Sequence, residues 1–256
     1  MSSVSNCKRV LVLPDIHVPV HDDISLRAIE AYAQNYEWDS IGYLGDFMDF
    51  DSISHHSKGN IEAITRTTIE HDLKIGNELL DRHKLIKADN RWLISGNHDY
   101  RAVRFAQENP QFKGLLEVQN SLHLKERGIE FIDFWGTGQA KRIGKATFIH
   151  GLYCNDAHAK KQVQTYGTNV FYGHLHDRQL YSLCHNGDNK TLIGESIGCL
   201  CKYRQFYMRG RPNRWQQAFA VFHFFPDGYF NHYVVDIFKH RFISPEGEVY
   251  DGTKTK

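Results

Sequence analysis

The 256-residue sequence lacks the features of a membrane protein and of a basic protein that coats nucleic acid. It has no run of about 18 apolar residues, so we expect no transmembrane helix and no membrane partner. The apolar stretch at 10–14 is too short for a signal peptide, which predicts a cytoplasmic protein. Lys and Arg number 31 against 30 Asp and Glu. The net charge of +1 excludes a globally basic surface but allows a local basic patch.

Cysteine is scarce, and extended linkers are missing. The five cysteines are an odd number and scattered, which favours free thiols in a reducing compartment. Cys199 and Cys201 are a weak zinc signal, because no second cysteine pair stands at a zinc-finger spacing, and their role is left open. There is no internal repeat, low-complexity tract or Pro/Ser-rich linker. We therefore predict one domain over residues 1–256.

The order of predicted elements indicates an α/β fold. In the first half, strands at 8–13, 40–44 and 91–94 alternate with a helix capped near Asp22 and a long helix over 62–87. This alternation favours a parallel or mixed sheet with right-handed crossovers. The second half has one predicted helix at 156–166 and mostly short strands, at 128–135, 139–143, 146–150, 169–172, 178–184, 190–195, 217–225 and 229–238. A layered or sandwich-like α/β domain is the simplest architecture.

Histidine is abundant, with 16 residues, and imidazole is a common metal ligand. Five polar clusters each follow the end of a predicted strand, and the carboxyl ends of strands line one crevice in an α/β sheet. Each cluster alone is also typical of a turn or a helix cap. Together they supply seven donors: Asp15, His17, Asp46, Asn97, His150, His174 and His176. Oxygen and nitrogen donors in this number suit two divalent ions (Mn, Fe, Ni, Co or Zn) if one carboxylate bridges them.

Two such ions would point to phosphoester chemistry. Held about 3.5–4 Å apart, they can bind a phosphoryl oxygen and lower the pKa of a water between them. The set of seven candidate ligands is complete without His98, which lies in sequence between Asn97 and the carboxylate of Asp99. Because the ordinary pKa of histidine is near neutral, His98 is the candidate general acid.

The order D-x-H, G-D, G-N-H-[DE], H and G-H-x-H resembles that of the calcineurin-like metallophosphoesterases, over about residues 9–177. The resemblance implies a four-layered α/β/β/α sandwich with mixed sheets and a dinuclear metal site at the carboxyl ends of the strands. It assigns one ion to Asp15, His17 and His176, the other to Asn97, His150 and His174, and the bridging position to Asp46. It also implies that His98 protonates or stabilises the leaving oxygen, with Asp99 orienting or polarising it.

Differences from the motifs of related subfamilies narrow the range of possible substrates. Phosphoprotein phosphatases of this superfamily carry G-D-x-V-D-R-G, whereas residues 45–51 read GDFMDFD, so the phosphate-binding arginine is absent. The chain also lacks the length for the capping domain of double-strand-break repair nucleases of this fold. Segments 49–58, 194–201 and 215–221 look like those of phosphoesterases encoded in phage and prophage genomes. That resemblance implies the cytoplasm of an infected host.

Residues 202–214 combine five basic and three aromatic residues with no acid. This composition is typical of a contact with single-stranded nucleic acid or a nucleotide, although a solvated loop can share it. Arg204 and Arg209 are the candidate phosphate contacts. His55 and His56 follow the second motif and either reach the substrate or lie on the surface.

Three functions are open at this point. The favoured one is a metal-dependent phosphodiesterase that acts on nucleic acid or nucleotide diesters by attack of a hydroxide between two ions, with manganese as the expected metal. The first alternative is a phosphomonoesterase or pyrophosphatase acting on a small phosphorylated compound. The second is a non-catalytic metal-binding scaffold. The oligomeric state is left open.

Overall fold

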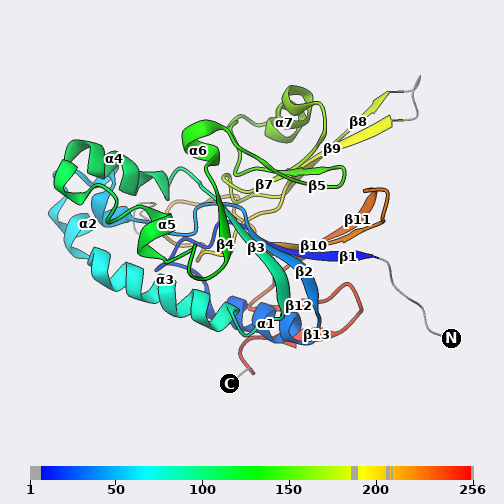
Figure 1. Ribbon diagram of the computed structural model, residues 1–256, viewed down its shortest axis with the longest axis horizontal. Coiled ribbons are helices and arrows are strands. Elements are labelled where there is room, and N and C mark those ends of the chain that lie inside the picture. Colours follow the sequence, from blue (N-terminus) through cyan, green and yellow to red (C-terminus); the bar gives the residue numbers. More distant parts are fainter. Residues whose placement is uncertain (1–6, 186–189, 206–207, 209, 255–256) are drawn as a thin grey trace.

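The structure is a computed structural model that describes residues 7–185, 190–205, 208 and 210–254. Two β-sheets face each other, and helices cover their outer surfaces (Figure 1). Helices α1 (Asp23–Gln34) and α3 (Ile69–His83) pack on the larger sheet, and α7 (His158–Tyr166) packs on the smaller one. The predicted four-layered α/β/β/α sandwich with mixed sheets is therefore confirmed.

The larger sheet has six strands in the order β11-β10-β1-β2-β3-β4. Its strands are β1 (Lys8–Leu13), β2 (Trp38–Tyr43), β3 (Ala88–Ile94), β4 (Ile129–Ile132), β10 (Ala218–Phe224) and β11 (Phe230–Asp236). Strands β1 to β4 are mutually parallel, as the βαβαβ pattern predicts. Strand β10 runs antiparallel to β1, with Val10 opposite Phe222, and β11 runs antiparallel to β10.

The smaller sheet has five strands in the order β5-β6-β7-β9-β8. Its strands are β5 (Lys141–Ile143), β6 (Ala146–Phe148), β7 (Asn169–Tyr172), β8 (Gln179–His185) and β9 (Lys190–Ser196). Strands β6, β7 and β9 are parallel, and β8 pairs with β9 as the predicted hairpin. The turn predicted at 185–189 lies outside the described residues except for His185. Strands β12 (Arg241–Ile243) and β13 (Val249–Asp251) form a separate antiparallel pair.

The alternation of side chains along β1 divides the core in two. Val10 and Val12 pack in the cluster that lies between the sheets, whereas Leu11 and Leu13 pack in the cluster formed with the helices. Successive strand side chains point to opposite faces, so one short apolar strand contributes to both clusters. This double burial explains why β1 reads as a continuous apolar run, and it fixes where the polar loop after Leu13 begins.

The single long helix predicted over 62–87 is wrong. The structure has two helices there, α2 (Ile61–Thr65) and α3, separated by the threonine pair at 67–68. The Thr67 hydroxyl donates to Asp72 at 2.6 Å, and Thr68 caps α3 by accepting from the His71 N–H at 3.1 Å. Threonine side chains compete with the helix for backbone and side-chain hydrogen bonds, so a new helix begins at this pair.

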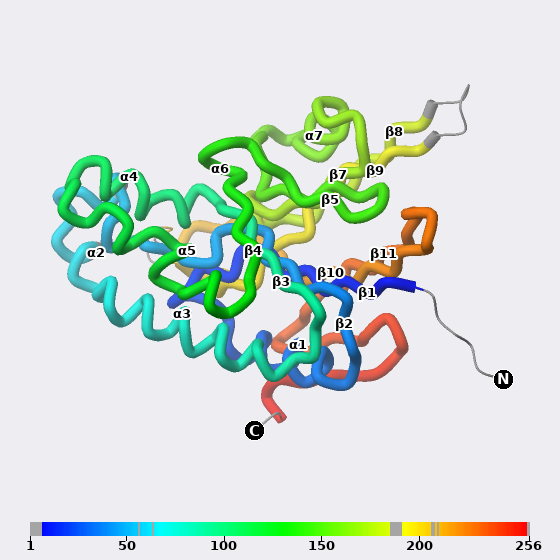
Figure 2. Tube along the Cα trace, in the orientation of Figure 1, coloured from blue at the N-terminus to red at the C-terminus, as the bar shows by residue number. Residues whose placement is uncertain are grey.

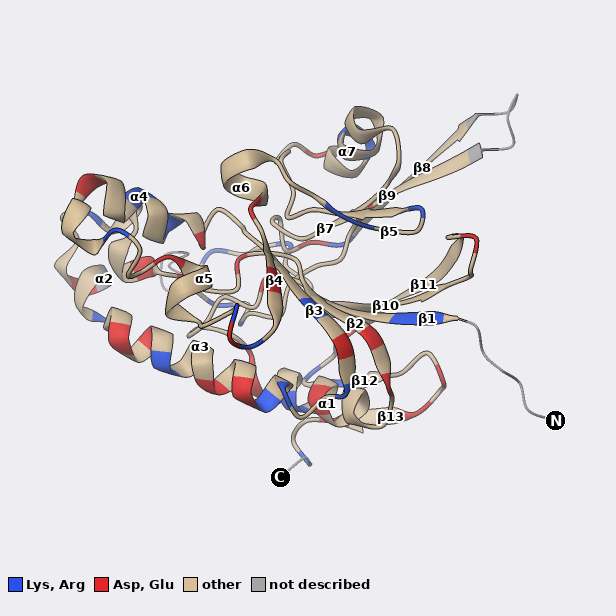
Figure 3. Ribbon diagram, in the orientation of Figure 1, with Lys and Arg blue, Asp and Glu red and all other residues tan. Residues whose placement is uncertain are grey.

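Several short elements connect the strands at one end of the molecule (Figure 2). The helical elements not predicted from sequence are η1 (Asp51–Ile53), η2 (His55–Ser57), α4 (Tyr100–Glu108), η3 (Pro110–Phe112), α5 (Val118–Ser121) and α6 (Phe134–Thr137), and strands β12 and β13 were not predicted either. The strand predicted at 128–135 ends at Ile132, because Asp133 caps α6 by accepting from the Gly136 N–H. In Figure 3, Lys and Arg are interspersed with Asp and Glu along α3, so this helix carries no continuous basic stripe. Among the described helices, none has the length and apolar character needed to cross a bilayer.

Candidate metal centre

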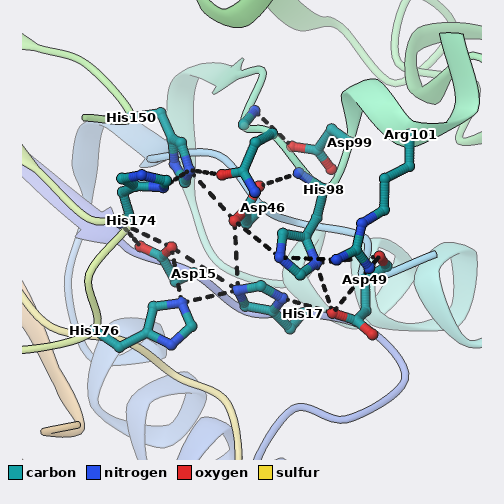
Figure 4. Close-up of polar contacts among 12 residues, drawn as sticks. Asp15, His17, Asp46, Asp49, His98, Asp99, Arg101, His150, His174 and His176 are labelled. Atoms are coloured by element: carbon teal, nitrogen blue, oxygen red, sulfur yellow. Dashed lines mark hydrogen bonds and ion pairs between the residues drawn. The ribbon is translucent and has the colours of Figure 1, made fainter. Parts of the chain in front are cut away.

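Loops that follow β1, β2, β3, β6 and β7 converge at the carboxyl ends of these strands (Figure 4). All seven candidate ligands lie in one connected cluster. Each side chain of this cluster has a polar atom within 4 Å of a polar atom of another member. The members are Asp15, His17, Asp46, Asn97, His150, His174 and His176. The crevice expected from an α/β sheet is therefore where the polar clusters meet.

One half of the cluster contains Asp15, His17 and His176. The Nε2 atoms of His17 and His176 are 3.0 Å apart, and Asp15 Oδ1 lies 3.3 Å from His176 Nε2 and 3.9 Å from His17 Nε2. All three side chains are almost fully buried. Three donor atoms therefore face one small space.

The other half contains Asn97, His150 and His174. His150 Nε2 lies 3.0 Å from Asn97 Oδ1 and 3.2 Å from His174 Nδ1. Asp46 lies between the two halves, with Oδ2 3.3 Å from His150 Nε2 and 3.6 Å from His17 Nε2. Its position is the one required of a bridging carboxylate.

The outer nitrogens of two histidines show why this cluster fits cations. His150 Nδ1 lies 2.8 Å from the Leu44 carbonyl oxygen, which can only accept, so in the neutral ring Nε2 carries the lone pair. His17 Nδ1 lies 2.9 Å from Asp49 Oδ1, which fixes its neutral ring in the same way. Both lone pairs then face the Asp46 carboxylate. Two imidazole lone pairs and a carboxylate repel one another unless a cation lies between them, so the donors match a metal site.

Burial changes the pKa of most groups in this cluster. It raises the pKa of Asp15 to about 7 and lowers the pKa of both His174 and His176 to about 3. Burial also lowers the pKa of His150, but the Asp46 charge overcomes this effect and raises it to about 9. Metal-free, the cluster therefore disfavours ionised Asp15 while it stabilises protonated His150. Bound cations would supply the missing positive charge.

The backbone at the cluster is strained. Five of the seven candidate ligands have a left-handed backbone, with φ of 44° at Asp15, 55° at His17, 46° at Asp46, 72° at His174 and 63° at His176. Residues other than glycine adopt this region uncommonly, and each instance costs on the order of 1–3 kcal/mol. Strain of this kind persists where the surrounding structure enforces it, and it is concentrated here at the side chains that face the cluster.

Two glycines allow the carboxylates to reach their positions. A Cβ atom on Gly173 would lie 1.6 Å from Asp15 Oδ2, and one on Gly96 would lie 2.1 Å from Asp46 Oδ1. Asp15 uses this space to accept from the His174 N–H, at 2.9 Å to Oδ1. Asp46 Oδ1 accepts from the His98 N–H at 2.7 Å. A side chain at either glycine would displace a candidate ligand.

His98 lies beside the cluster, as predicted, but its partner is a residue to which we assigned no role. Its Nδ1 is 2.8 Å from Asp49 Oδ1, the same oxygen that contacts His17, and its Nε2 is 4.0 Å from Asp46 Oδ2. Burial lowers the pKa of His98, but Asp46 and Asp49 together raise it above its ordinary value. The signal for Asp49 was present in the sequence as the second aspartate after Gly45. Its contact with His98 depends on the path of the loop.

Asp99 does not contact the His98 ring. Its buried carboxylate accepts from three backbone N–H groups, of Met48 and Gly96 at 2.9 Å each and of Phe47 at 3.3 Å. The expectation that Asp99 orients the ring is therefore corrected, because Asp49 occupies that position. Asp99 instead ties the loop after β2 to the loop after β3.

Arg101, in the first turn of α4, is a second residue that we did not predict. Its Nη2 lies 3.3 Å from His98 Nε2, and its Nη1 donates to the Asp49 carbonyl oxygen at 2.8 Å. The sequence lacks the arginine that follows the second motif in phosphoprotein phosphatases. The structure brings a guanidinium to the cluster from another element.

The candidate substrate contacts lie elsewhere or outside the described residues. Arg204 is exposed, and among the described residues no hydrogen bond or ion pair joins it to the cluster. Arg209 lies outside the described residues. His55 is exposed and lines a cavity of about 610 Å³ with Lys58 and Arg104, and this cavity includes no candidate ligand. His56 belongs to η2, and its side chain is outside the described part of the chain.

Cysteines and tryptophans surround the candidate ligands. Cys199 and Cys201 are buried near His176, with Cys201 Sγ 3.9 Å from His176 Nδ1. The Trp215 ring lies 4.3 Å from the His176 ring, and the Trp135 ring lies 5.6 Å from the His174 ring. These contacts hold the outer sides of the imidazoles and limit their rotation.

Comparisons with known proteins found distant similarities in sequence and in structure. No protein-family model matches the sequence. The gene 54 protein of Mycobacterium phage L5 is 25% identical over 224 residues, which cover 84% of this chain and 88% of that protein. The gene 54 protein of Mycobacterium phage D29 is 24% identical over 224 residues, with the same shares. These two proteins support the expected likeness to phage-encoded proteins.

Among solved structures, Vps29 from Chaetomium thermophilum is similar with a TM-score of 0.49 and 11% identity, covering 96% of this chain and 98% of that chain. Wild-type Vps29 of Entamoeba histolytica complexed with Zn²⁺ has a TM-score of 0.44 and 10% identity, with 94% and 95% covered. The nuclease MPE of Pseudomonas putida has a TM-score of 0.35 and 14% identity, with 86% and 85% covered. Similarity this low assigns neither a ligand nor an activity.

Proposed function

We propose that this chain, which has the fold and the motif order of the calcineurin-like metallophosphoesterases, is a metal-dependent phosphodiesterase acting on nucleotide diesters or nucleic acid. Asp15, His17 and His176 would hold one divalent cation, and Asn97, His150 and His174 the other, with Asp46 shared. When bound, such ions offset phosphoryl charge and make a water more acidic. Manganese is the metal we propose to test first.

The observation that carries the proposal is the position of His98 between Asp46 and Asp49. Asp49 accepts from Nδ1, which leaves Nε2 directed toward the cluster. His98 can therefore donate a proton from Nε2 to the oxygen that leaves the phosphorus. The Asp49 carboxylate stabilises the charged ring and keeps its orientation.

Arg101 supports a phosphoryl substrate of low charge. Its guanidinium is close to His98 Nε2 and would donate to a phosphoryl oxygen bound there. Its Nη1 also lies 4.0 Å from Asp49 Oδ1 and 3.8 Å from Asp51 Oδ1, so two carboxylates offset its charge. A diester carries one negative charge and a monoester carries up to two near neutral pH. The carboxylates therefore favour the diester.

The proposal is tested by comparing bis(p-nitrophenyl) phosphate with p-nitrophenyl phosphate in the presence of Mn²⁺, with the bound metal measured by elemental analysis. We expect two ions per chain and a higher kcat/KM for the diester. A strong preference for the monoester would replace the diesterase with a phosphomonoesterase. Protein that binds metal and hydrolyses neither compound would instead support a scaffold.

The partner and the location are proposed on weaker grounds. Arg211 and Arg214 in the basic segment 202–214 are exposed, which supports an electrostatic contact with single-stranded nucleic acid. If this contact forms, log affinity for single-stranded DNA should fall steeply with log salt. Absence of DNA binding at low salt would leave a small nucleotide as the substrate. The two phage proteins support a location in the cytoplasm of an infected bacterium.

A further inference from the structure

A cavity of about 620 Å³ lies beside the candidate metal centre. It is lined by the loop after β1 at 19–20, by Asp49 and Asp51, by parts of segment 65–75, and by Lys202 and Gln205. Its volume is in the range of about 300–1,000 Å³ typical of small-molecule sites. Residues 65–68, where the predicted long helix is interrupted, form one wall of this cavity.

Asp49 connects this cavity to the reacting groups. The same side chain lines the cavity and contacts His98 Nδ1 at 2.8 Å. Asp51, another lining residue, lies 3.8 Å from Arg101 Nη1. His98 Nε2, which would release the proton, lies 3.3 Å from Arg101 Nη2, so Arg101 joins the leaving group to the Asp51 side of this cavity.

The lining is suited to a neutral occupant that donates hydrogen bonds. Carboxylates of Asp49, Asp51 and Asp72 outnumber the two cations, Arg66 and Lys202. Asp49 and Asp51 already face His98 and Arg101, so Asp72 is the lining carboxylate left to accept from an occupant. Pro19, Val20 and Ile75 add apolar surface, against which a planar ring can pack.

Asp72, in this wall, has one carboxylate oxygen without a hydrogen-bond partner among the described residues. The residue is fully buried, and its Oδ1 accepts from the Thr67 hydroxyl. Its Oδ2 is also buried and has no hydrogen-bond partner among the described residues. Buried carboxylate oxygens are nearly always paired, because an unpaired one costs free energy. A ligand N–H or O–H would supply the missing donor after a small side-chain adjustment.

We propose that this cavity binds the leaving group of the diester and that the leaving group is a single nucleoside, with Asp72 accepting a hydrogen bond from its base or sugar. Carboxylates accept from the amino groups of bases, and the apolar wall accommodates the face of the ring. A glycerol-type alcohol offers the same hydroxyl donors without a ring. The inference rests on the proposed phosphodiesterase activity.

The test compares kcat/KM for a dinucleoside monophosphate, a glycerophosphoglycerol diester and bis(p-nitrophenyl) phosphate with Mn²⁺. In Asp72→Asn we expect the ratio of the dinucleotide value to the bis(p-nitrophenyl) value to fall roughly 10–100-fold, the loss typical of one hydrogen bond to a charged group. The matched control is Glu70→Gln, an exposed acid in the same turn of α3 that does not line the cavity, and its ratio should not change. A second variant, His71→Trp, enlarges an exposed lining residue and should lower the same ratio.

The outcomes separate the two proposals. If wild-type protein hydrolyses none of the three diesters, the proposed function fails. If it hydrolyses them and neither variant changes the ratio, the nucleoside cavity is overturned while the activity stands. An equal fall for all three substrates in Asp72→Asn would make Asp72 purely structural. A fall shared only by the two natural diesters would replace the nucleoside with a hydroxylated alcohol.

Discussion

The two sheets contribute unequally to the candidate metal centre. Segments that follow strands of the larger sheet supply both candidate carboxylate ligands, the amide of Asn97 and the imidazole of His17. They also supply the groups that handle protons and phosphoryl charge, His98, Asp49 and Arg101. Loops of the smaller sheet supply imidazoles alone, at His150, His174 and His176. Charge compensation and proton transfer are therefore concentrated on one side of the sandwich, and neutral nitrogen donors complete the site from the other.

The largest effect should come from the shared carboxylate. Asp46→Asn removes the charge between both halves of the cluster, so we expect phosphodiester hydrolysis to fall to background and to stay there at saturating Mn²⁺. His174→Ala removes one neutral donor, and part of its activity should return as Mn²⁺ is raised. Metal titrations of both variants measure this difference. Equal rescue of the two would contradict the unequal roles of the sheets.

The next effect concerns proton transfer alone. His98→Asn should lower kcat by about 10²–10⁴-fold, the contribution typical of a general acid, while two ions remain bound. Single-turnover rates and elemental analysis of the same preparation check both statements. Retained activity would remove the assigned role, and loss of metal would make His98 part of the metal site.

A smaller loss of activity is expected from Arg101, which also follows a strand of the larger sheet. Arg101→Ala should lower kcat/KM for the diester by roughly 10–100-fold, because a charged hydrogen bond to the phosphoryl group is lost. Arg104 is a matched control on α4, since it is exposed and lines the separate cavity beside His55. Arg104→Ala should leave kcat/KM unchanged. Identical losses in the two variants would point to the stability of α4 as the cause.

The smallest effect is on stability, and it comes from Asp72 in α3, outside both sheets. Burial raises the pKa of Asp72 to about 6, above its unfolded value near 4. The folded state therefore binds more protons in this interval, and the free energy of unfolding falls as pH rises from about 4 to about 6. Relative to Asp72→Asn, wild-type protein should lose stability across this window and in no other. Denaturant titrations at a series of pH values measure the difference, and parallel curves would contradict it.

Much of the fold and the ligand set could be predicted from the sequence because both depend on local patterns. Strands β1 and β7 are apolar runs that end at polar residues, and the predicted ranges 8–13 and 169–172 match them. Ligands at strand ends follow directly, since the ends of neighbouring strands meet. The division of the donors between two ions came only from the resemblance to the calcineurin-like metallophosphoesterases, and it stays a prediction.

The residues that were missed depend on the path that the chain takes after each strand. Asp49 reaches His98 because the loop turns through left-handed backbone at Asp46 and again at Phe50, where φ is 49°. Arg101 lies three residues after His98 and contacts it because the chain turns into α4 at this point, whereas its contact with the Asp49 carbonyl oxygen spans 52 residues. The cavity requires the helix break at 67–68 to face Lys202, which lies more than a hundred residues away in the chain. Periodicity carries no information on such pairings.

A left-handed backbone at a candidate ligand lowers the stability of the fold while it places a donor in the cluster. Five residues share this conformation: Asp15, His17, Asp46, His174 and His176. Replacing one of these residues by glycine would relieve local torsional cost while deleting a donor, so an inactive chain could outlast the active one in a metal-free thermal melt. Selection for robustness alone would therefore erode the cluster. Cations that bind only the folded cluster would return this lost stability to the loaded protein.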